Sequence, residues 1–167
     1  MSLGVHHEKD AGEAWWFLDT RMTIKADSVT TNGAYTLLEF TAPRDFGPPR
    51  HVHHTEDEAF VVLDGELRVE CGDDVWDVEP GGFVFLPRSI PHALLVVSGH
   101  PVRALQLTTP GGFEHFVAAV GARATGPGLP SPAAPDVPAL AAASVRFHTE
   151  IVGPPLPHDR TDGAGGR

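Results

Sequence analysis

Residues that commonly bind metal ions gather near the middle of the chain. Residues 51–54 read His-Val-His-His, and two carboxylates, Asp57 and Glu58, follow closely. A further histidine, His92, comes after a proline-rich segment. Several imidazoles with one carboxylate suit a divalent first-row transition metal, whereas burying such groups without a partner is costly. The residue types therefore predict a metal site.

Strand geometry limits which of these side chains can share a site. Side chains two residues apart on a strand point to the same face, so His51 and His53 can point together while His54 faces solvent. His53 and Glu58 are five residues apart, which requires a turn between them. After that turn either Asp57 or Glu58 could enter the site, because both faces of the following strand are apolar. Spacing alone leaves the identity of the carboxylate open.

The elements that must position these residues are short strands. Between Tyr35 and Thr109, β-branched and aromatic runs alternate with clusters of Gly, Pro or Asp, a pattern typical of a sandwich or barrel. The expected strands include residues 67–71, 75–78, 83–86, 92–97 and 102–108. His92 would thus open a strand with an apolar wall. The sequence predicts an all-β fold.

Helical spacing appears only after the strands. Residues 113–120 carry apolar side chains at helical intervals and predict a short helix that caps the barrel. After a segment rich in Pro, Gly, Ala and Ser, Asp136 is a plausible N-cap of a second helix ending near His148. Its expected apolar stripe is Leu140, Val145 and Phe147. The predicted organisation is a barrel with an N-terminal arm and capping helix over 1–120, and a C-terminal extension with one short helix over 121–167, ending in a mobile stretch.

Composition excludes several classes of protein. The 167 residues contain 12 Lys and Arg against 22 Asp and Glu, a net charge of −10 that disfavours nucleic-acid binding. No apolar run approaches the roughly 20 residues of a membrane span. The single cysteine, Cys71, excludes an internal disulfide and is expected in the core. Because residues 1–20 lack a basic segment followed by an apolar one, we expect a cytoplasmic protein.

Two motifs in the chain resemble those of the cupins, in particular single-domain bacterial proteins of the quercetin 2,3-dioxygenase-like type. The first motif is His51, His53, Glu58 and Gly65, and the second is Gly81, Pro87 and His92. The sequences of four stretches also resemble those of this group: residues 47–67, 81–93, 109–116 and 150–156. The chain departs from the family pattern by having Asp45 and Ser89 where glycines are usual, and Val96 where asparagine is usual.

The resemblance implies a double-stranded β-helix, or jelly-roll, barrel with an N-terminal arm and C-terminal helices. It also implies that His51, His53, Glu58 and His92 hold a divalent Fe, Mn, Ni, Co, Cu or Zn ion, which selects Glu58 over Asp57. The implied activity is that of a dioxygenase that uses dioxygen on a small aromatic or enolic compound, with flavonols such as quercetin as the example. Glu58 would be both ligand and catalytic base.

Further expectations concern the surroundings of the site and the assembly of the protein. The wall of the substrate pocket is expected to include Phe60, Val62, Phe83, Phe85, Leu94 and Val96. Arg50 or Arg88 could hold an acidic substituent at its mouth. Trp15 and Trp16 would pack an N-terminal arm against the barrel or against a second subunit, and we expect a homodimer. The alternatives to an oxygenase are a non-catalytic cupin that binds a small molecule or metal for sensing or sequestration, and a metal-dependent isomerase.

Overall fold

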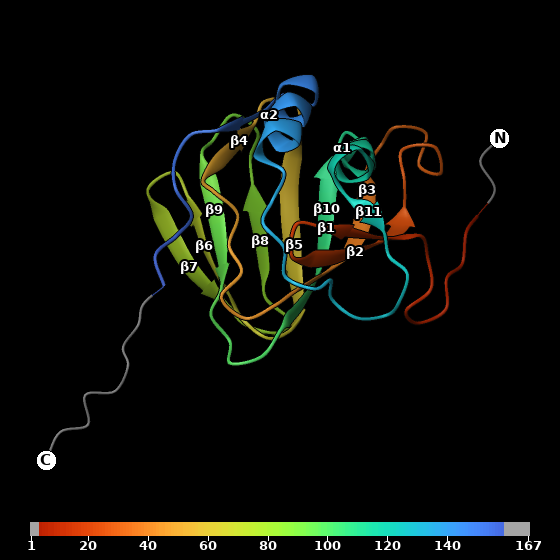
Figure 1. The fold of residues 1–167 in the computed structure, drawn as a ribbon, viewed down its shortest axis with the longest axis horizontal. Helices are drawn as coiled ribbons and strands as arrows, with labels where there is room; N and C mark the ends of the chain where they lie inside the picture. Colours follow the sequence, from red (N-terminus) through yellow and green to blue (C-terminus); the bar gives the residue numbers. More distant parts are fainter. Residues whose placement is uncertain (1–3, 159–167) are drawn as a thin grey trace, which may run out of the picture.

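The computed structural model describes residues 4–158, and these residues form mainly β-strands (Figure 1). The strands are β1 (Ala14–Phe17), β2 (Thr20–Ala26), β3 (Thr36–Ala42), β4 (His51–His53), β5 (Asp57–Asp64), β6 (Leu67–Cys71), β7 (Asp74–Val78), β8 (Phe83–Leu86), β9 (His92–Val96), β10 (Val102–Thr109), β11 (Ala122–Arg123) and β12 (Thr149–Ile151). The helices are α1 (Phe113–Val120) and α2 (Val137–Arg146). The predicted all-β class is confirmed.

The described strands form two antiparallel sheets. One has the order β11-β1-β2-β3-β10-β5-β8, and the other has the order β12-β4-β9-β6-β7. Figure 1 shows the second sheet on the left, with α1 and α2 at the upper end of the molecule. Alternating burial along β3, β6 and β10 gives each sheet one face toward a shared core, as period-two strands require. Cys71 lies buried in this core, as predicted.

The N-terminal arm contains strands that the sequence did not predict. Strands β1 and β2 pair with each other, and β2 pairs with β3 at the side of the larger sheet. The indole of Trp16 donates to the carbonyl of Gly128 at 3.0 Å, and the Arg123 guanidinium lies 5.3 Å from the centre of the Trp15 ring. Both tryptophans therefore pack against their own chain. The homodimer stays a prediction.

Both predicted helices are present. Helix α1 has the predicted bounds and buries Phe113, Phe116 and Val117. Asp136 caps α2, because its carboxylate accepts a hydrogen bond from the backbone N–H of Ala139 at 3.0 Å.

The expected apolar stripe on α2 is partly wrong. Leu140 and Phe147 pack against the core, but Val145 is 80% exposed. Helix α2 buries Ala143 and Ser144 instead. Because successive helical positions are rotated around the axis, Val145 then points away from the buried face.

The C-terminal segment returns to the sheets. Strand β12 pairs with β4, opposite His53, Val52 and His51. The boundary between residues 120 and 121 stays a prediction, and residues 159–167, part of the expected mobile end, lie outside the described residues. Neither α1 nor α2 is long and apolar enough to cross a membrane.

Candidate metal centre

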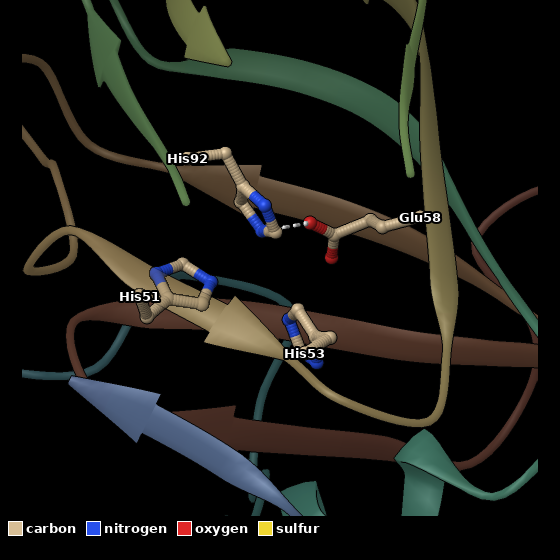
Figure 2. A group of neighbouring side chains, drawn as sticks. All are labelled: His51, His53, Glu58 and His92. Atoms are coloured by element: carbon tan, nitrogen blue, oxygen red, sulfur yellow. Dashed lines mark ion pairs between the residues drawn. The ribbon is translucent and has the colours of Figure 1, made fainter. Parts of the chain in front are cut away.

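Four side chains from both sheets converge on one point (Figure 2). His51 and His53 lie on β4, His92 opens the neighbouring strand β9 opposite His51, and Glu58 comes from β5 in the other sheet. One potential ligand atom from each lies within 4.8 Å of the others. The side chains predicted as metal ligands are thus brought together by the fold.

The parity expectation for the neighbouring residues is confirmed. His54 points away from the cluster, with Nε2 2.9 Å from a carboxylate oxygen of Glu150. Glu58 is buried in the cluster, whereas Asp57 faces outward and pairs with Arg88 at 2.7 Å. The structure therefore resolves the alternative that spacing left open, and Glu58 is the carboxylate inside.

Each clustered imidazole has a partner on its Nδ1 side. His51 Nδ1 lies 2.7 Å from the carbonyl of Pro49, and His92 Nδ1 lies 2.9 Å from the carbonyl of Ile90. His53 Nδ1 lies 3.5 Å from a carboxylate oxygen of Glu56. An Nδ1–H that donates to such an acceptor leaves Nε2 as a lone-pair donor, which is the arrangement that orients metal-binding histidines.

The cluster fits a divalent transition metal. His92 Nε2 is buried and has no hydrogen-bond partner among residues 4–158. It lies 3.4 Å from a carboxylate oxygen of Glu58. Three imidazoles and a carboxylate are a nitrogen- and oxygen-donor set suited to most first-row divalent ions. A cation at this point would use the lone pairs that the protein leaves unpaired.

Burial and mutual charge set the protonation of the cluster. Burial lowers the pKa of His51 to about 4, helped by the positive charges of His92 and His53. Burial opposes ionisation of Glu58, but its contact with His92 and the charge of the nearby histidines lower its pKa to about 2. Burial also lowers the pKa of His53, but the carboxylates of Glu56 and Glu58 have the larger, opposite effect, so the pKa of His53 lies above its usual value. Glu58 is therefore ionised and His51 neutral at pH 7.

The turn before His92 keeps the conformation that glycine favours although glycine is absent. Ser89 has a φ of 65°, and its N–H donates to the carbonyl of His53 at 2.8 Å. Asp45, the other departure from the glycine pattern, has a φ of 64°. Left-handed backbone costs about 1–2 kcal/mol at a residue with a Cβ. The surrounding hydrogen bonds hold the Ser89 turn, so this departure leaves His92 in place.

A cavity of about 90 Å³ lies beside the cluster, a volume that several water molecules would fill. His51, His53 and Glu58 form its polar side, and the expected wall residues Phe60 and Leu94 line it. Most of its remaining wall is apolar: Phe17, Leu18, Met22, Phe40, Phe46, Pro48, Pro49, Phe113, Phe116, Leu140 and Ile151. The site suits a small ligand with a large apolar surface.

Several predicted pocket residues are placed elsewhere. Phe83 and Phe85 are 64% and 49% exposed on β8, so their assignment to the wall is wrong. Their neighbours Val84 and Leu86 point inward instead, opposite Phe60 and Glu58 of β5. A strand that is apolar on both faces gives no parity signal from which this orientation could be inferred.

The remaining expected pocket residues do not line the cavity. Val62 and Val96 belong to the core cluster. Arg50 pairs with Glu70, and Arg88 pairs with Asp57. Both arginines pair with acids that do not line the cavity, and the expectation that one of them holds an acidic substituent at its mouth stays a prediction.

The sequence analysis missed Gln106. This residue of β10 lines the cavity, and its Nε2 donates to Glu58 Oε1 at 2.6 Å. The available signal was a glutamine at the same parity as Val102 and Ala104, both fully buried. Residues of the C-terminal segment, including Leu140, Ser144 and Thr149, were missed because their contact with the cavity depends on the return of β12 to β4.

Comparisons with known proteins agree with this geometry. Residues 38–108 match the family model described as a Cupin domain. Over 110 residues the chain is 24% identical to quercetin 2,3-dioxygenase from Bacillus subtilis, an alignment that covers 66% of this chain and 32% of that protein. The chain thus spans about a third of the length of this curated relative.

Solved structures share the fold at low sequence identity. The polyketide cyclase RemF from Streptomyces resistomycificus superimposes with a TM-score of 0.56 and 21% identity, covering 64% of this chain and 80% of RemF. A predicted oxalate decarboxylase from Thermotoga maritima gives a TM-score of 0.56 and 14% identity, covering 64% of this chain and 99% of that chain. The fold is the jelly roll that the motifs implied, and residues 38–108 within it are similar to the cupin domain family.

Proposed function

We propose that this protein is a metal-dependent dioxygenase that acts on a small aromatic or enolic compound. In this proposal His51, His53, Glu58 and His92 hold one divalent ion. The observation that carries the proposal is the convergence of these side chains, with the Nδ1 side of every imidazole facing an acceptor. The distant similarity to a quercetin 2,3-dioxygenase supports the oxygenase class. Fe, Mn, Ni, Co, Cu and Zn all suit the donor set.

A bound transition metal would supply Lewis acidity toward a substrate hydroxyl and a route for electrons to dioxygen. The protein's own groups handle the proton and the position of the ring. Glu58 is the carboxylate that would take the hydroxyl proton, whose acidity a bound metal would increase. Gln106 holds one of the Glu58 oxygens by a hydrogen bond of 2.6 Å. Phe60 and Phe113 line the cavity and offer apolar contacts for an aromatic ring.

Oxygen uptake tests the proposal directly. Protein loaded separately with Fe, Mn, Ni and Co is given flavonols and single-ring enols or catechols. We expect oxygen uptake with at least one combination of metal and compound. Glu58→Ala should lose this uptake, whereas His54→Ala should retain it because His54 faces away from the cluster. Uptake in Glu58→Ala equal to that of the wild type would contradict the assigned role of Glu58.

The alternative functions appear as other outcomes of the same panel. A compound that is isomerised without oxygen indicates a metal-dependent isomerase. Binding without conversion or oxygen uptake indicates a cupin that senses or sequesters a ligand. Either result would overturn the dioxygenase assignment and leave the metal site intact.

We also propose a homodimer that forms through the outer face of the larger sheet. Strands β10, β5 and β8 are neighbours, and their outward side chains are largely apolar: Leu105, Leu107, Val61, Leu63, Phe83 and Phe85. Two chains that each carry a net charge of −10 repel each other, so an uncharged face is the most favourable place for contact. In this dimer the apolar patch forms the centre of the interface, and the residues around it form the polar rim. A stable interface of this kind buries about 800 Å² per partner.

Sedimentation at several concentrations tests the dimer. We expect the wild type to be dimeric, Phe83→Asp to be monomeric, and the control Val29→Asp, at an 80% exposed loop position, to remain dimeric. A monomeric wild type at high concentration, or a dimeric Phe83→Asp variant, would refute this interface.

A further inference from the structure

Gln106 presents an unused hydrogen-bond acceptor beside the metal cluster. The side chain is 3% exposed and lines the cavity. Its Nε2 donates to Glu58 Oε1 at 2.6 Å, but its Oε1 is buried without a hydrogen-bond partner among residues 4–158. Buried polar atoms without partners are rare and point to a function or to a missing ligand.

The orientation of this amide follows from the chemistry of its neighbour. A carboxylate that binds a metal is ionised and only accepts hydrogen bonds, so it must face the NH₂ group of Gln106. The carbonyl oxygen of the same amide is then turned away from Glu58. Rotating the amide by 180° would set two acceptors against each other, which excludes the other assignment.

The environment of Gln106 offers little else to satisfy that oxygen. Across the strand pair Gln106 lies opposite Phe60, and the cavity wall around the cluster is mainly apolar. The polar groups of the cluster are either Nε2 atoms that face the proposed metal or oxygens of Glu58. Thr108, the next inward side chain of β10, also has a buried hydroxyl without a partner, so among residues 4–158 no donor lies within hydrogen-bond distance of Gln106 Oε1. The occupant of the cavity is the remaining source of a donor.

We propose that Gln106 Oε1 accepts a hydrogen bond from a hydroxyl group of the ligand, and that this hydroxyl is adjacent to the ligand oxygen that binds the metal. This rests on the proposed metal-dependent function and narrows its substrate class. The ligand then carries two adjacent oxygens on a planar frame, one that loses its proton to Glu58 and one that keeps it. Catechols and enediols have this pattern, whereas simple phenols and their ortho-methyl ethers lack the second donor. Gln106 is in this sense a specificity-determining residue.

A matched pair of optical probes isolates this hydrogen bond. 4-Nitrocatechol carries the second hydroxyl, and 2-methoxy-4-nitrophenol carries a methyl ether in its place. Both change absorbance on binding, so dissociation constants can be measured with Co(II)-loaded protein and no turnover. Cobalt loading is first confirmed from its visible absorption bands.

We expect Gln106→Leu to reduce the preference for nitrocatechol over its methyl ether by about threefold to tenfold, the effect of one hydrogen bond. Affinity for the ether should change little. Phe60→Leu is the control, because it alters the same cavity wall for both probes and should leave their affinity ratio unchanged. If Gln106→Leu does not fold, Gln106→Met, closer in shape to glutamine, takes its place.

The failures of the two proposals are distinguishable. If cobalt binds the wild type but the affinity ratio is the same in the Gln106 variant, the role of Gln106 is refuted and the metal centre stands. If the wild type shows no cobalt bands, the metal-dependent function fails, and the assignment of the ligand class fails with it.

Discussion

Metal loading should raise the thermal stability of this protein, because the clustered side chains join strands of both sheets. Glu58 lies on β5, whereas His51, His53 and His92 lie on β4 and β9 of the other sheet. An ion that binds only the folded chain adds about 2.7 kcal/mol when its concentration is 100 times Kd. For a domain of this length, that corresponds to an increase in Tm of about 5–11 °C.

Circular dichroism melts of chelator-treated protein, before and after addition of Co(II), measure this shift. His92→Ala removes one of the four donors and should lose most of the metal-induced increase. His54→Ala should keep all of it, because His54 adjoins the cluster in sequence but pairs with Glu150 outside it. Mg²⁺ should have no effect, since it prefers oxygen ligands in an octahedral arrangement.

Two results would refute the reasoning. One is a wild-type protein whose Tm is unchanged by every first-row divalent ion tested. The other is a His92→Ala variant that gains as much stability from Co(II) as the wild type, which would place the bound ion elsewhere.

Other predictions concern the fold that carries the site. Burial raises the pKa of Glu114 in the folded state, but hydrogen bonds from Ser28 and Thr36 outweigh it and lower the pKa. The ionised Glu114 side chain therefore contributes fully to the free energy of unfolding above its unfolded-state pKa. This contribution is lost as pH falls through the folded-state pKa. Urea melts between pH 2 and 7 should show Glu114→Gln less stable by about 1–2 kcal/mol at pH 7, a gap that closes in acid; a constant gap would contradict this. Asp136→Ala should cost about 1 kcal/mol through loss of the α2 cap, and unchanged stability in the same melts would argue against the cap. Val117→Ala, at a fully buried position of α1, should destabilise by at least about 1 kcal/mol, whereas Val145→Ala, at an exposed position of α2, should be neutral or slightly stabilising. Equal effects of the two substitutions would contradict the observed burial of Val117 and exposure of Val145.

The orientation of the three neighbouring histidines was predictable because its information is local. Period-two geometry paired His51 with His53 and turned His54 outward without any knowledge of the fold. The choice between Asp57 and Glu58 depends on what lies on each side of β5, which the burial of Glu58 in the cluster and the pairing of Asp57 with Arg88 show. In the sequence analysis that choice came from the family resemblance.

Residues that depend on sheet register were not predictable from local pattern. In β10 the apolar side chains Leu105 and Leu107 point outward, and the polar Gln106 and Thr108 point inward. Hydrophobicity alone predicts the reverse. Gln106 is accommodated because its Nε2 donates to Glu58 on the neighbouring strand β5, a contact set by two segments about fifty residues apart.

Part of the cavity wall is encoded outside the stretch of the chain that holds the polar cluster. His51, His53, Glu58 and His92 all lie within residues 38–108, whereas Phe17, Met22, Phe113, Phe116, Leu140, Ser144, Thr149 and Ile151 all lie outside that range. Relatives could keep one reaction centre while exchanging the flanking segments that shape its chamber. Grafting α2, residues 137–146, between such relatives is therefore a route to new selectivity that leaves the metal-binding strands β4, β5 and β9 unchanged.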